Sequence, residues 1–118
     1  MIVDDSATMR RMIQAALRDV DAVRFDEADS GLAAIERLAV VPVHLMTLDL
    51  NMPDMHGLDV LRFIRAQPSY QTLPIIVLTT RGDADARAAT LAAGASLCLS
   101  KPFSPSVLAT HVRELLQA

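Results

Sequence analysis

The sequence predicts an α/β domain in which a five-stranded parallel sheet is covered by helices on both faces. Five short apolar runs alternate with five segments of helical periodicity along the 118 residues. The apolar runs in the middle of the chain are continuous rather than alternating with polar residues, which is typical of strands buried on both faces. Parallel strands are joined by right-handed crossover helices that cover the sheet. The predicted architecture is therefore doubly wound and three-layered.

In the first half of the chain, these patterns predict three strands and two helices. The strands are expected at Met1–Val3, Val23–Phe25 and Leu45–Leu48. Between the first two strands, apolar side chains follow helical spacing from Met9 to Val20. A second helix is expected near Leu32–Ala39, because Ser30 can cap its amino end.

In the second half, helices and strands continue to alternate. The expected elements are a helix at Leu58–Arg65, a strand at Ile75–Leu78, a helix at Asp85–Ala93 and a strand at Leu97–Leu99. Gly94 is suited to end the helix before the last strand. Ser104 followed by Pro105 opens a final helix, whose apolar side chains recur from Val107 to Leu116.

The composition restricts the chain to a few classes of protein. The length fits a single domain, residues 1–118, and an apolar content of 52% excludes a disordered chain. The formal net charge of -3 and the scattered basic residues argue against nucleic-acid binding. The one cysteine, Cys98, cannot form an internal disulfide, and no apolar run is long enough to cross a bilayer. We therefore expect a cytoplasmic protein that binds neither nucleic acid nor membrane.

Three carboxylates follow two of the predicted strands. Asp4 and Asp5 come directly after the first strand, and Asp49 follows the third. The carboxyl ends of parallel strands form the ligand-binding edge of open α/β sheets, so these side chains are expected to converge. A hard divalent cation with oxygen ligands, Mg²⁺ above all, would relieve their mutual repulsion. Taken singly, each acid is more often a residue of a helix end or a turn.

Two further motifs complete a set that resembles the response-regulator receiver family. The fourth strand is followed by Thr79-Thr80, and the fifth by Lys101-Pro102. The other matching motifs are Val3-Asp4-Asp5-Ser6 and Asn51-Met52-Pro53. The set looks most like the chemotaxis members of the family and spans the chain. It implies a flavodoxin-like sheet with strand order 2-1-3-4-5, in which the first strand is internal. Only three residues precede Asp4, so this strand is unusually short for its place.

The resemblance gives each polar residue of the set a role. It implies that Asp49 accepts a phosphoryl group, while Thr79 and Lys101 contact that group. It also implies a cis peptide bond between Lys101 and Pro102. Mg²⁺ is expected to be held by Asp4, Asp5, Asp49 and the backbone carbonyl of Asn51. Phosphoryl transfer needs charge neutralisation by a metal and fixed donors rather than acid–base chemistry, so this set is chemically sufficient.

The expected function is that of a phospho-acceptor receiver in a two-component pathway, with chemotaxis as the expected pathway. A histidine kinase is the expected phosphodonor, and a downstream protein such as a flagellar motor component is the expected target. The chain is then a signalling switch and not an enzyme, because phosphorylation favours one of two arrangements of a binding surface.

Departures from the family and three other functions stay open at this point. The family usually has an aromatic residue where this chain has Cys98, and Thr80 and Arg81 differ from the chemotaxis pattern. The chain is alternatively a receiver cut from a regulator with a DNA-binding domain, or a phosphohydrolase with Asp49 as nucleophile. A hydrolase would want a second acid where Asn51 stands. An interaction module that works without phosphorylation is disfavoured by the full set of site residues.

Overall fold

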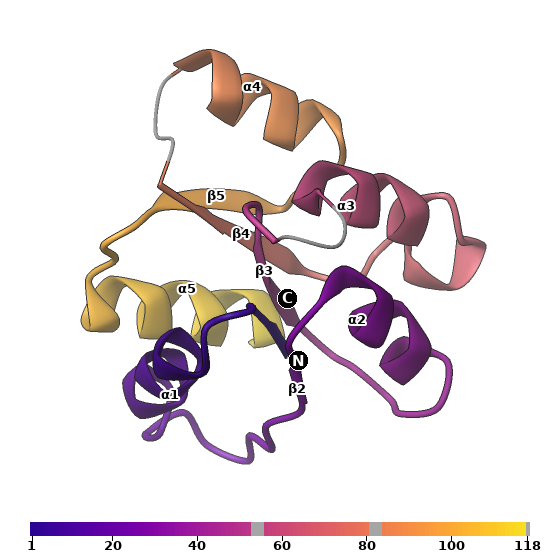
Figure 1. Cartoon of the computed structure of the whole chain (residues 1–118). Coiled ribbons are helices and arrows are strands. Elements are labelled where there is room, and N and C mark those ends of the chain that lie inside the picture. Colours follow the sequence, from indigo (N-terminus) through magenta and orange to yellow (C-terminus); the bar gives the residue numbers. More distant parts are fainter. Residues whose placement is uncertain (53–55, 81–83, 118) are drawn as a thin grey trace.

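A five-stranded parallel sheet forms the middle layer of the molecule (Figure 1). The computed structural model describes residues 1–52, 56–80 and 84–117. The strands are β1 Ile2–Val3, β2 Glu27–Ala28, β3 Met46–Asp49, β4 Ile75–Thr79 and β5 Leu97–Ser100. They lie in the order β2-β1-β3-β4-β5, with each neighbouring pair parallel. The predicted fold class and strand order are confirmed.

Helices cover both faces of the sheet (Figure 1). They are α1 Ala7–Ala16, α2 Gly31–Leu38, α3 Gly57–Arg65, α4 Ala84–Ala92 and α5 Pro105–Gln117, with a short 3₁₀ helix at Pro68–Tyr70. Neighbouring residues of β4 show the alternation of faces. Ile76 packs in a cluster with side chains of α1 and α5, whereas Val77 packs with those of α2 and α3. No helix in the described part of the chain is long and apolar enough to cross a membrane.

Several predicted helix ends are confirmed. The Ser30 hydroxyl accepts a hydrogen bond from the Ala33 amide at 3.0 Å and caps α2. Gly94 follows α4 with a φ of 113°, a left-handed conformation that favours glycine. Pro105 is the first residue of α5, where its missing amide costs no hydrogen bond.

The first helix is shorter than its apolar spacing predicts. α1 ends at Ala16, and the chain turns before Val20, although Leu17 and Val20 are both buried. Leu17 and Val20 are apolar because they are buried in the turn after the helix, and their spacing in the sequence looks like one more turn of helix. Met12, which the same spacing assigns to the apolar stripe, is 50% exposed.

The second strand lies further along the chain than predicted. The run Val23–Phe25 is not a strand, and β2 is Glu27–Ala28 instead. A strand exists only where it has a hydrogen-bonded neighbour, and β1 pairs with β2 through Ile2 and Val3. The apolar run locates the segment that enters the sheet, but the residues that pair are set by the partner strand.

Candidate functional site

The predicted acidic residues meet at the carboxyl edge of the sheet. Asp4 follows β1, and Asp49 ends the adjacent strand β3. Oxygen atoms from the carboxylates of Asp4, Asp5 and Asp49 all lie within 4.8 Å of one another. Asp4 and Asp49 are buried, whereas Asp5 is exposed. Asp5 is thus the member of the acidic cluster that water reaches.

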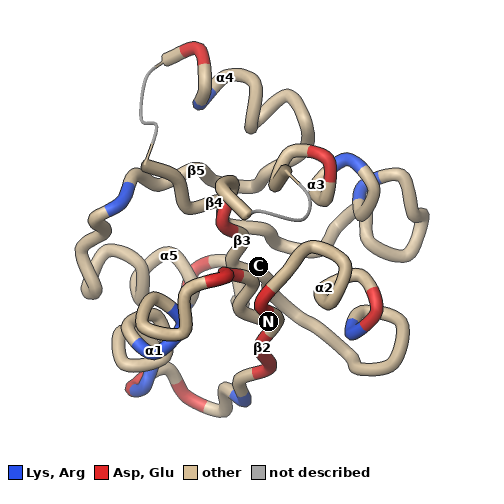
Figure 2. Tube along the Cα trace, viewed as in Figure 1, with Lys and Arg blue, Asp and Glu red and all other residues tan. Residues whose placement is uncertain are grey.

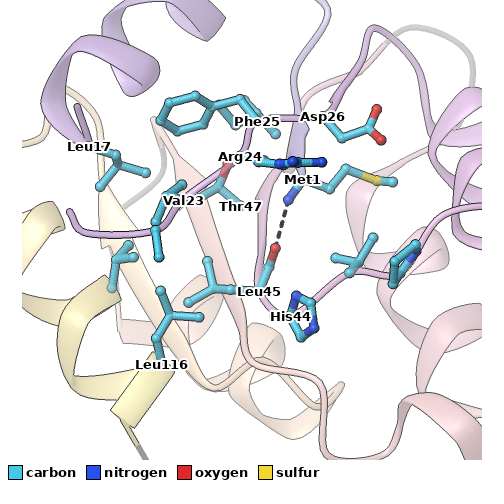
Figure 3. A pocket seen from close by; sticks show the side chains of 15 residues that line it. Met1, Leu17, Val23, Arg24, Phe25, Asp26, His44, Leu45, Thr47 and Leu116 are labelled. Atoms are coloured by element: carbon cyan, nitrogen blue, oxygen red, sulfur yellow. Dashed lines mark hydrogen bonds between the residues drawn. The ribbon is translucent and has the colours of Figure 1, made fainter. Parts of the chain in front are cut away.

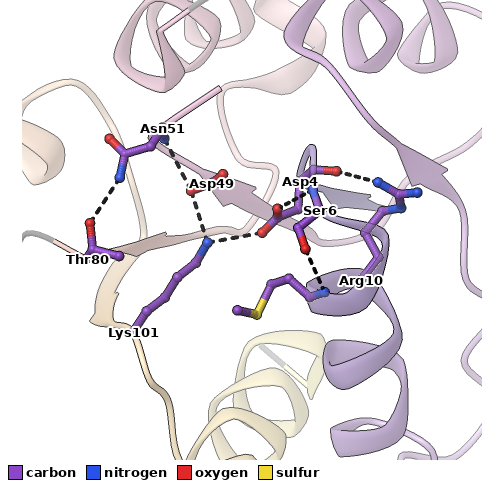
Figure 4. A network of polar contacts seen from close by, with 8 residues as sticks. Asp4, Ser6, Arg10, Asp49, Asn51, Thr80 and Lys101 are labelled. Carbon is purple, nitrogen blue, oxygen red and sulfur yellow. Dashed lines mark hydrogen bonds and ion pairs between the residues drawn. The ribbon is translucent and has the colours of Figure 1, made fainter. Parts of the chain in front are cut away.

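Asp4 accepts three hydrogen bonds (Figure 4). Its Oδ1 accepts from the Ser6 amide at 2.9 Å, and its Oδ2 accepts from the Lys101 ammonium at 3.1 Å. Its backbone carbonyl accepts from the Arg10 guanidinium at 2.7 Å. Ser6 in turn caps α1, because its hydroxyl accepts from the Met9 amide at 3.1 Å. The amino end of α1 and a basic side chain therefore fix the position of this carboxylate.

Lys101 bridges the two buried carboxylates (Figure 4). Its Nζ lies 3.1 Å from Asp4 Oδ2 and 3.1 Å from Asp49 Oδ1. The Asn51 amide donates to the same Asp49 oxygen at 3.2 Å. The other oxygen, Asp49 Oδ2, accepts no hydrogen bond from the described residues. One oxygen of Asp49 is thus fixed, and the other is left for a ligand.

Thr79 and Lys101 are joined through the backbone of the sheet. Thr79 ends β4, is buried, and stands opposite Ser100 of β5 in the parallel register. The Lys101 amide donates to the Thr79 carbonyl at 2.7 Å. The peptide bond between Lys101 and Pro102 is cis, as the family resemblance implies. The ends of four strands thus bring the predicted site residues to one edge.

A side-chain hydrogen bond crosses this edge between the loops that follow β3 and β4. The Asn51 Nδ2 donates to the Thr80 hydroxyl at 3.2 Å, and both residues are exposed (Figure 4). This contact engages the Asn51 side chain, while its backbone carbonyl, the predicted metal ligand, accepts no hydrogen bond from the described residues. Pro53 of the Asn51 motif and Arg81 lie outside the described residues.

Burial and hydrogen bonding act on the charges of the site in opposite directions. Burial raises the pKa of Asp4, and this effect exceeds the lowering by the Ser6 amide and Lys101, while the Asp49 charge raises the pKa further. Burial lowers the pKa of Lys101, but its hydrogen bonds to Asp4 and Asp49 outweigh this and raise the pKa overall. Lys101 therefore stays protonated at neutral pH, while the fold penalises the charge of Asp4.

The donor set fits a hard divalent cation. Three carboxylates face a single ammonium, which leaves two negative charges uncompensated when all three acids are ionised. Every candidate ligand atom is an oxygen, which suits Mg²⁺ and not a soft metal. The exposure of Asp5 suits an ion that keeps several water ligands.

Arg10 belongs to the site, although helical periodicity assigns it to a solvated face. Its side chain is 17% exposed and donates both to the Asp4 carbonyl and to Glu27, 3.0 Å away. Side chains on a helix lean towards its amino end, so a residue in the first turn can reach back to the preceding loop. The sequence feature that could have predicted this contact is the place of Arg10 in the first turn of α1. Ser6 caps this helix and directly follows Asp4 and Asp5.

Cys98 occupies the strand position at which the family usually has an aromatic ring. It is buried in the cluster that also contains Val77 and the inner side chains of α2 and α3. The Arg87 guanidinium of α4 donates to the Cys98 carbonyl at 2.9 Å. A small, enclosed thiol thus replaces a large side chain, and a charged side chain links α4 to β5 at this point.

Comparisons with known proteins identify the family of this chain. A family model described as "Response regulator receiver domain" matches residues 1–113. The chemotaxis protein CheY1 of Helicobacter pylori is 37% identical over 117 residues, which covers 98% of this chain and 94% of that protein.

Solved structures show the same similarity. A putative response regulator from Chloroflexus aurantiacus has a TM-score of 0.92 and 32% identity, covering 99% of this chain and 95% of its own. The chemotaxis response regulator CheY4 of Vibrio cholerae has a TM-score of 0.88 and 30% identity, covering 97% and 94% of the two chains. With its strand order, its acidic edge and these matches, the chain belongs to the response-regulator receiver family.

Proposed function

We propose that this chain is a phospho-acceptor receiver of a two-component pathway, in which Asp49 takes a phosphoryl group from the phosphohistidine of a histidine kinase. The observation that supports this most is the Lys101 ammonium, 3.1 Å from the carboxylates of both Asp4 and Asp49. A fixed positive charge beside a carboxylate nucleophile can neutralise the oxygens of a transferring phosphoryl group.

The geometry favours Asp49 Oδ2 as the attacking atom, because Oδ1 already accepts hydrogen bonds from Lys101 and Asn51. A P–O bond forms to this oxygen while the P–N bond to the kinase imidazole breaks. The imidazole leaves with the bonding electron pair and takes up a proton. Asp49 becomes a mixed anhydride, and Lys101 can then donate to a phosphoryl oxygen.

Asp4, Asp5 and Asp49 are the proposed ligands of Mg²⁺, together with the backbone carbonyl of Asn51. When bound, the ion supplies neutralisation of negative charge on the phosphoryl oxygens. The chain contributes the fixed orientation of its ligands, since Ser6, Arg10 and Lys101 already hold Asp4 in place.

Switching is proposed to start at Thr79 and Lys101, which would contact the phosphoryl group and favour one arrangement of the loop after β4 and of α4. Because Cys98 is small and buried, we assign the change to that loop and helix rather than to rotation of a ring on β5. The bond from Arg87 to the Cys98 carbonyl joins α4 to the strand and would respond to such a movement.

The proposed output is binding of a protein target, without catalytic turnover. The similarity to CheY proteins supports a chemotaxis pathway and a target such as a flagellar motor component. Lys and Arg are spread over several elements rather than gathered on one face, which supports a protein over a nucleic-acid partner (Figure 2). We also propose that residues 1–118 form one receiver domain and that the protein works in the cytoplasm.

Intact-mass spectrometry after incubation with acetyl phosphate and Mg²⁺ tests the proposal. We expect one phosphoryl adduct on the wild-type chain and none on Asp49→Asn, because an amide cannot form an acyl phosphate. Asp59→Asn, which removes an exposed acid of α3, is the matched control and should be phosphorylated like wild type. A full adduct on Asp49→Asn would move the acceptor to another residue, and multiple turnovers of a phosphate ester would favour a hydrolase.

A further inference from the structure

Asp5 is held differently from the other two acids of the cluster. Asp4 and Asp49 both accept hydrogen bonds from Lys101, whereas the Asp5 carboxylate is exposed and makes no hydrogen bond within the part of the chain that the structure describes. One of its oxygens nevertheless lies within 4.8 Å of oxygens of Asp4 and Asp49. The Asp5 side chain therefore takes its direction from its own backbone.

Two peptide units flank the Asp5 Cα, and a hydrogen bond holds each of them (Figure 4). Ahead of Asp5, the Arg10 Nη1 donates to the Asp4 carbonyl at 2.7 Å. After Asp5, the Ser6 amide donates to Asp4 Oδ1 at 2.9 Å. Asp4 is 1% exposed, so its carbonyl needs a donor from the protein. Without Arg10, the peptide unit ahead of Asp5 loses the group that fixes its orientation.

Arg10 replaces a backbone donor at the end of the ladder between β1 and β2. The Asp4 amide donates to the Ala28 carbonyl at 3.0 Å, which continues this ladder beyond β1. In a parallel ladder, the Asp4 carbonyl would next accept a hydrogen bond from the amide of residue 30. However, β2 ends at Ala28, and the chain turns into α2. The guanidinium therefore supplies the donor that the ladder lacks.

Glu27 of β2 fixes the guanidinium of Arg10. The Arg10 Nε lies 3.0 Å from Glu27 Oε1, while its Nη1 donates to the Asp4 carbonyl. Two nitrogens of one planar group are thus engaged by different partners, so the group is held in one orientation. Glu27 also balances the charge of Arg10, so the acidic edge gains a hydrogen-bond donor without a further net positive charge.

We propose that Arg10 and Glu27 are positioning residues of the metal site, which orient the peptide unit between Asp4 and Asp5 so that the Asp5 carboxylate faces the ion. This inference rests on the proposed Mg²⁺ site. The contact and the charge of Arg10 predict opposite effects for its removal. A nearby positive charge repels a cation, so loss of the charge alone would strengthen Mg²⁺ binding. Loss of the orientation would weaken it, because the ion must then order the backbone of Asp5, which costs about tenfold in affinity.

A titration with Mg²⁺, followed by the NMR shift of the Ser6 amide, tests the proposal without phosphorylation. We expect Arg10→Gln to raise the dissociation constant of Mg²⁺ by about tenfold. Arg11→Gln is the matched control, because it removes the same charge from an exposed neighbour on the same helix. It should leave the dissociation constant within about twofold of wild type or lower it.

Two further variants keep the test independent of any loss of stability in Arg10→Gln. Arg10→Lys keeps the charge but has one nitrogen where arginine uses two, so the dissociation constant should rise by roughly threefold or more. Glu27→Ala removes an exposed side chain of the edge strand β2 and should raise it by a similar factor. If Glu27 acts through Arg10, its removal in the Arg10→Gln background should have no further effect.

Asp5→Asn separates failure of this inference from failure of the proposed metal site. It should weaken Mg²⁺ binding by about tenfold, since it removes a ligand charge. If Asp5→Asn binds Mg²⁺ like wild type, the proposed site is wrong, and the role of Arg10 there is wrong with it. If Asp5→Asn weakens binding but Arg10→Gln binds as tightly as Arg11→Gln, the metal site stands and Arg10 only satisfies a buried carbonyl. A full effect of Glu27→Ala in the Arg10→Gln background would overturn the role of Glu27.

Discussion

The two ends of the sheet differ in how their polar groups are partnered. At the carboxyl end, Asp4 and Asp49 are buried, and both accept hydrogen bonds from Lys101. At the amino end, the amides of Arg24 and Leu45 face a cavity of about 400 Å³ and have no partner among the described residues (Figure 3). Buried polar groups need partners, and at the carboxyl end the ammonium of Lys101 supplies them. Side-chain hydrogen bonds thus organise the carboxyl end, whereas at the amino end backbone amides face a cavity.

The largest effect should come from crowding the loop that forms the carboxyl end. A Cβ added at Gly57 would lie 2.5 Å from the Leu50 Cα and 2.7 Å from the Asp49 carbonyl oxygen, so backbone would have to move. We expect Gly57→Ala to lower the free energy of unfolding by about 3 kcal/mol and to reduce phosphoryl uptake by Asp49. Urea denaturation measures the first effect and intact mass the second.

The control for this substitution is Ala89→Gly on the exposed side of α4, which exchanges the same two residue types without a clash. Helix propensity alone should then account for a loss of about 1 kcal/mol. If Gly57→Ala destabilises no more than this control, the loop after β3 is not tightly constrained.

The strands also differ in how well the sequence predicts their bounds. β3 and β4 lie close to their predicted bounds, because each is a continuous apolar run with partners on both sides. β2 does not, because its pairing residues depend on how far β1 reaches. The order of the strands came from family resemblance, since periodicity carries no information about which strands are neighbours.

The candidate site shows the same division. Asp4, Asp5 and Asp49 could be predicted because acids at the ends of parallel strands must share one edge. The contact of Arg10 with the Asp4 carbonyl could not, because it depends on where α1 begins and on the side-chain direction there. Sequence spacing identifies the residues that reach the site, whereas the hydrogen bonds that orient them require coordinates.

A pH series should reveal the burial of the Met1 amino group at the amino end of the sheet. The pKa of the Met1 amino group falls from its ordinary value of 8.0 to about 6 in the folded chain, so the unfolded chain binds more protons between these values. The free energy of unfolding should therefore rise as the pH is raised from 6 to 8, by up to about 2 kcal/mol. Urea denaturation at pH 6, 7 and 8 measures this slope.

Acetylation of the Met1 nitrogen is the control, because it removes the titrating group and leaves all three histidines in place. The rise in stability with pH should then shrink by the contribution of the amino group. An identical slope for the acetylated and unmodified chains would show that other groups cause the pH dependence and that the ammonium is not penalised by the fold.

The smallest effect on stability should come from the charge of Asp4, and its sign distinguishes the two ends. Burial raises the pKa of Asp4 above that of the unfolded chain, so stability is lost as the pH rises through the folded pKa and the carboxylate ionises. At pH 7 this loss is present, and Asp4→Asn should recover roughly 1 kcal/mol, because the amide oxygen can still accept from the Ser6 amide. The same variant should need about tenfold more Mg²⁺ for phosphorylation by acetyl phosphate, since one ligand charge is gone.

Asp5→Asn is the matched comparison, because Asp5 belongs to the same acidic cluster but is exposed. It should raise the Mg²⁺ requirement by a similar factor and leave the free energy of unfolding within about 0.5 kcal/mol of wild type. If Asp4→Asn alone gains stability while both variants need more Mg²⁺, then the buried charge of Asp4 lowers stability and is needed to bind the ion. If Asp4→Asn instead unfolds more easily than wild type, its bond to Lys101 outweighs the burial of its charge, and the carboxyl end is stabilised by the same contacts that serve the chemistry.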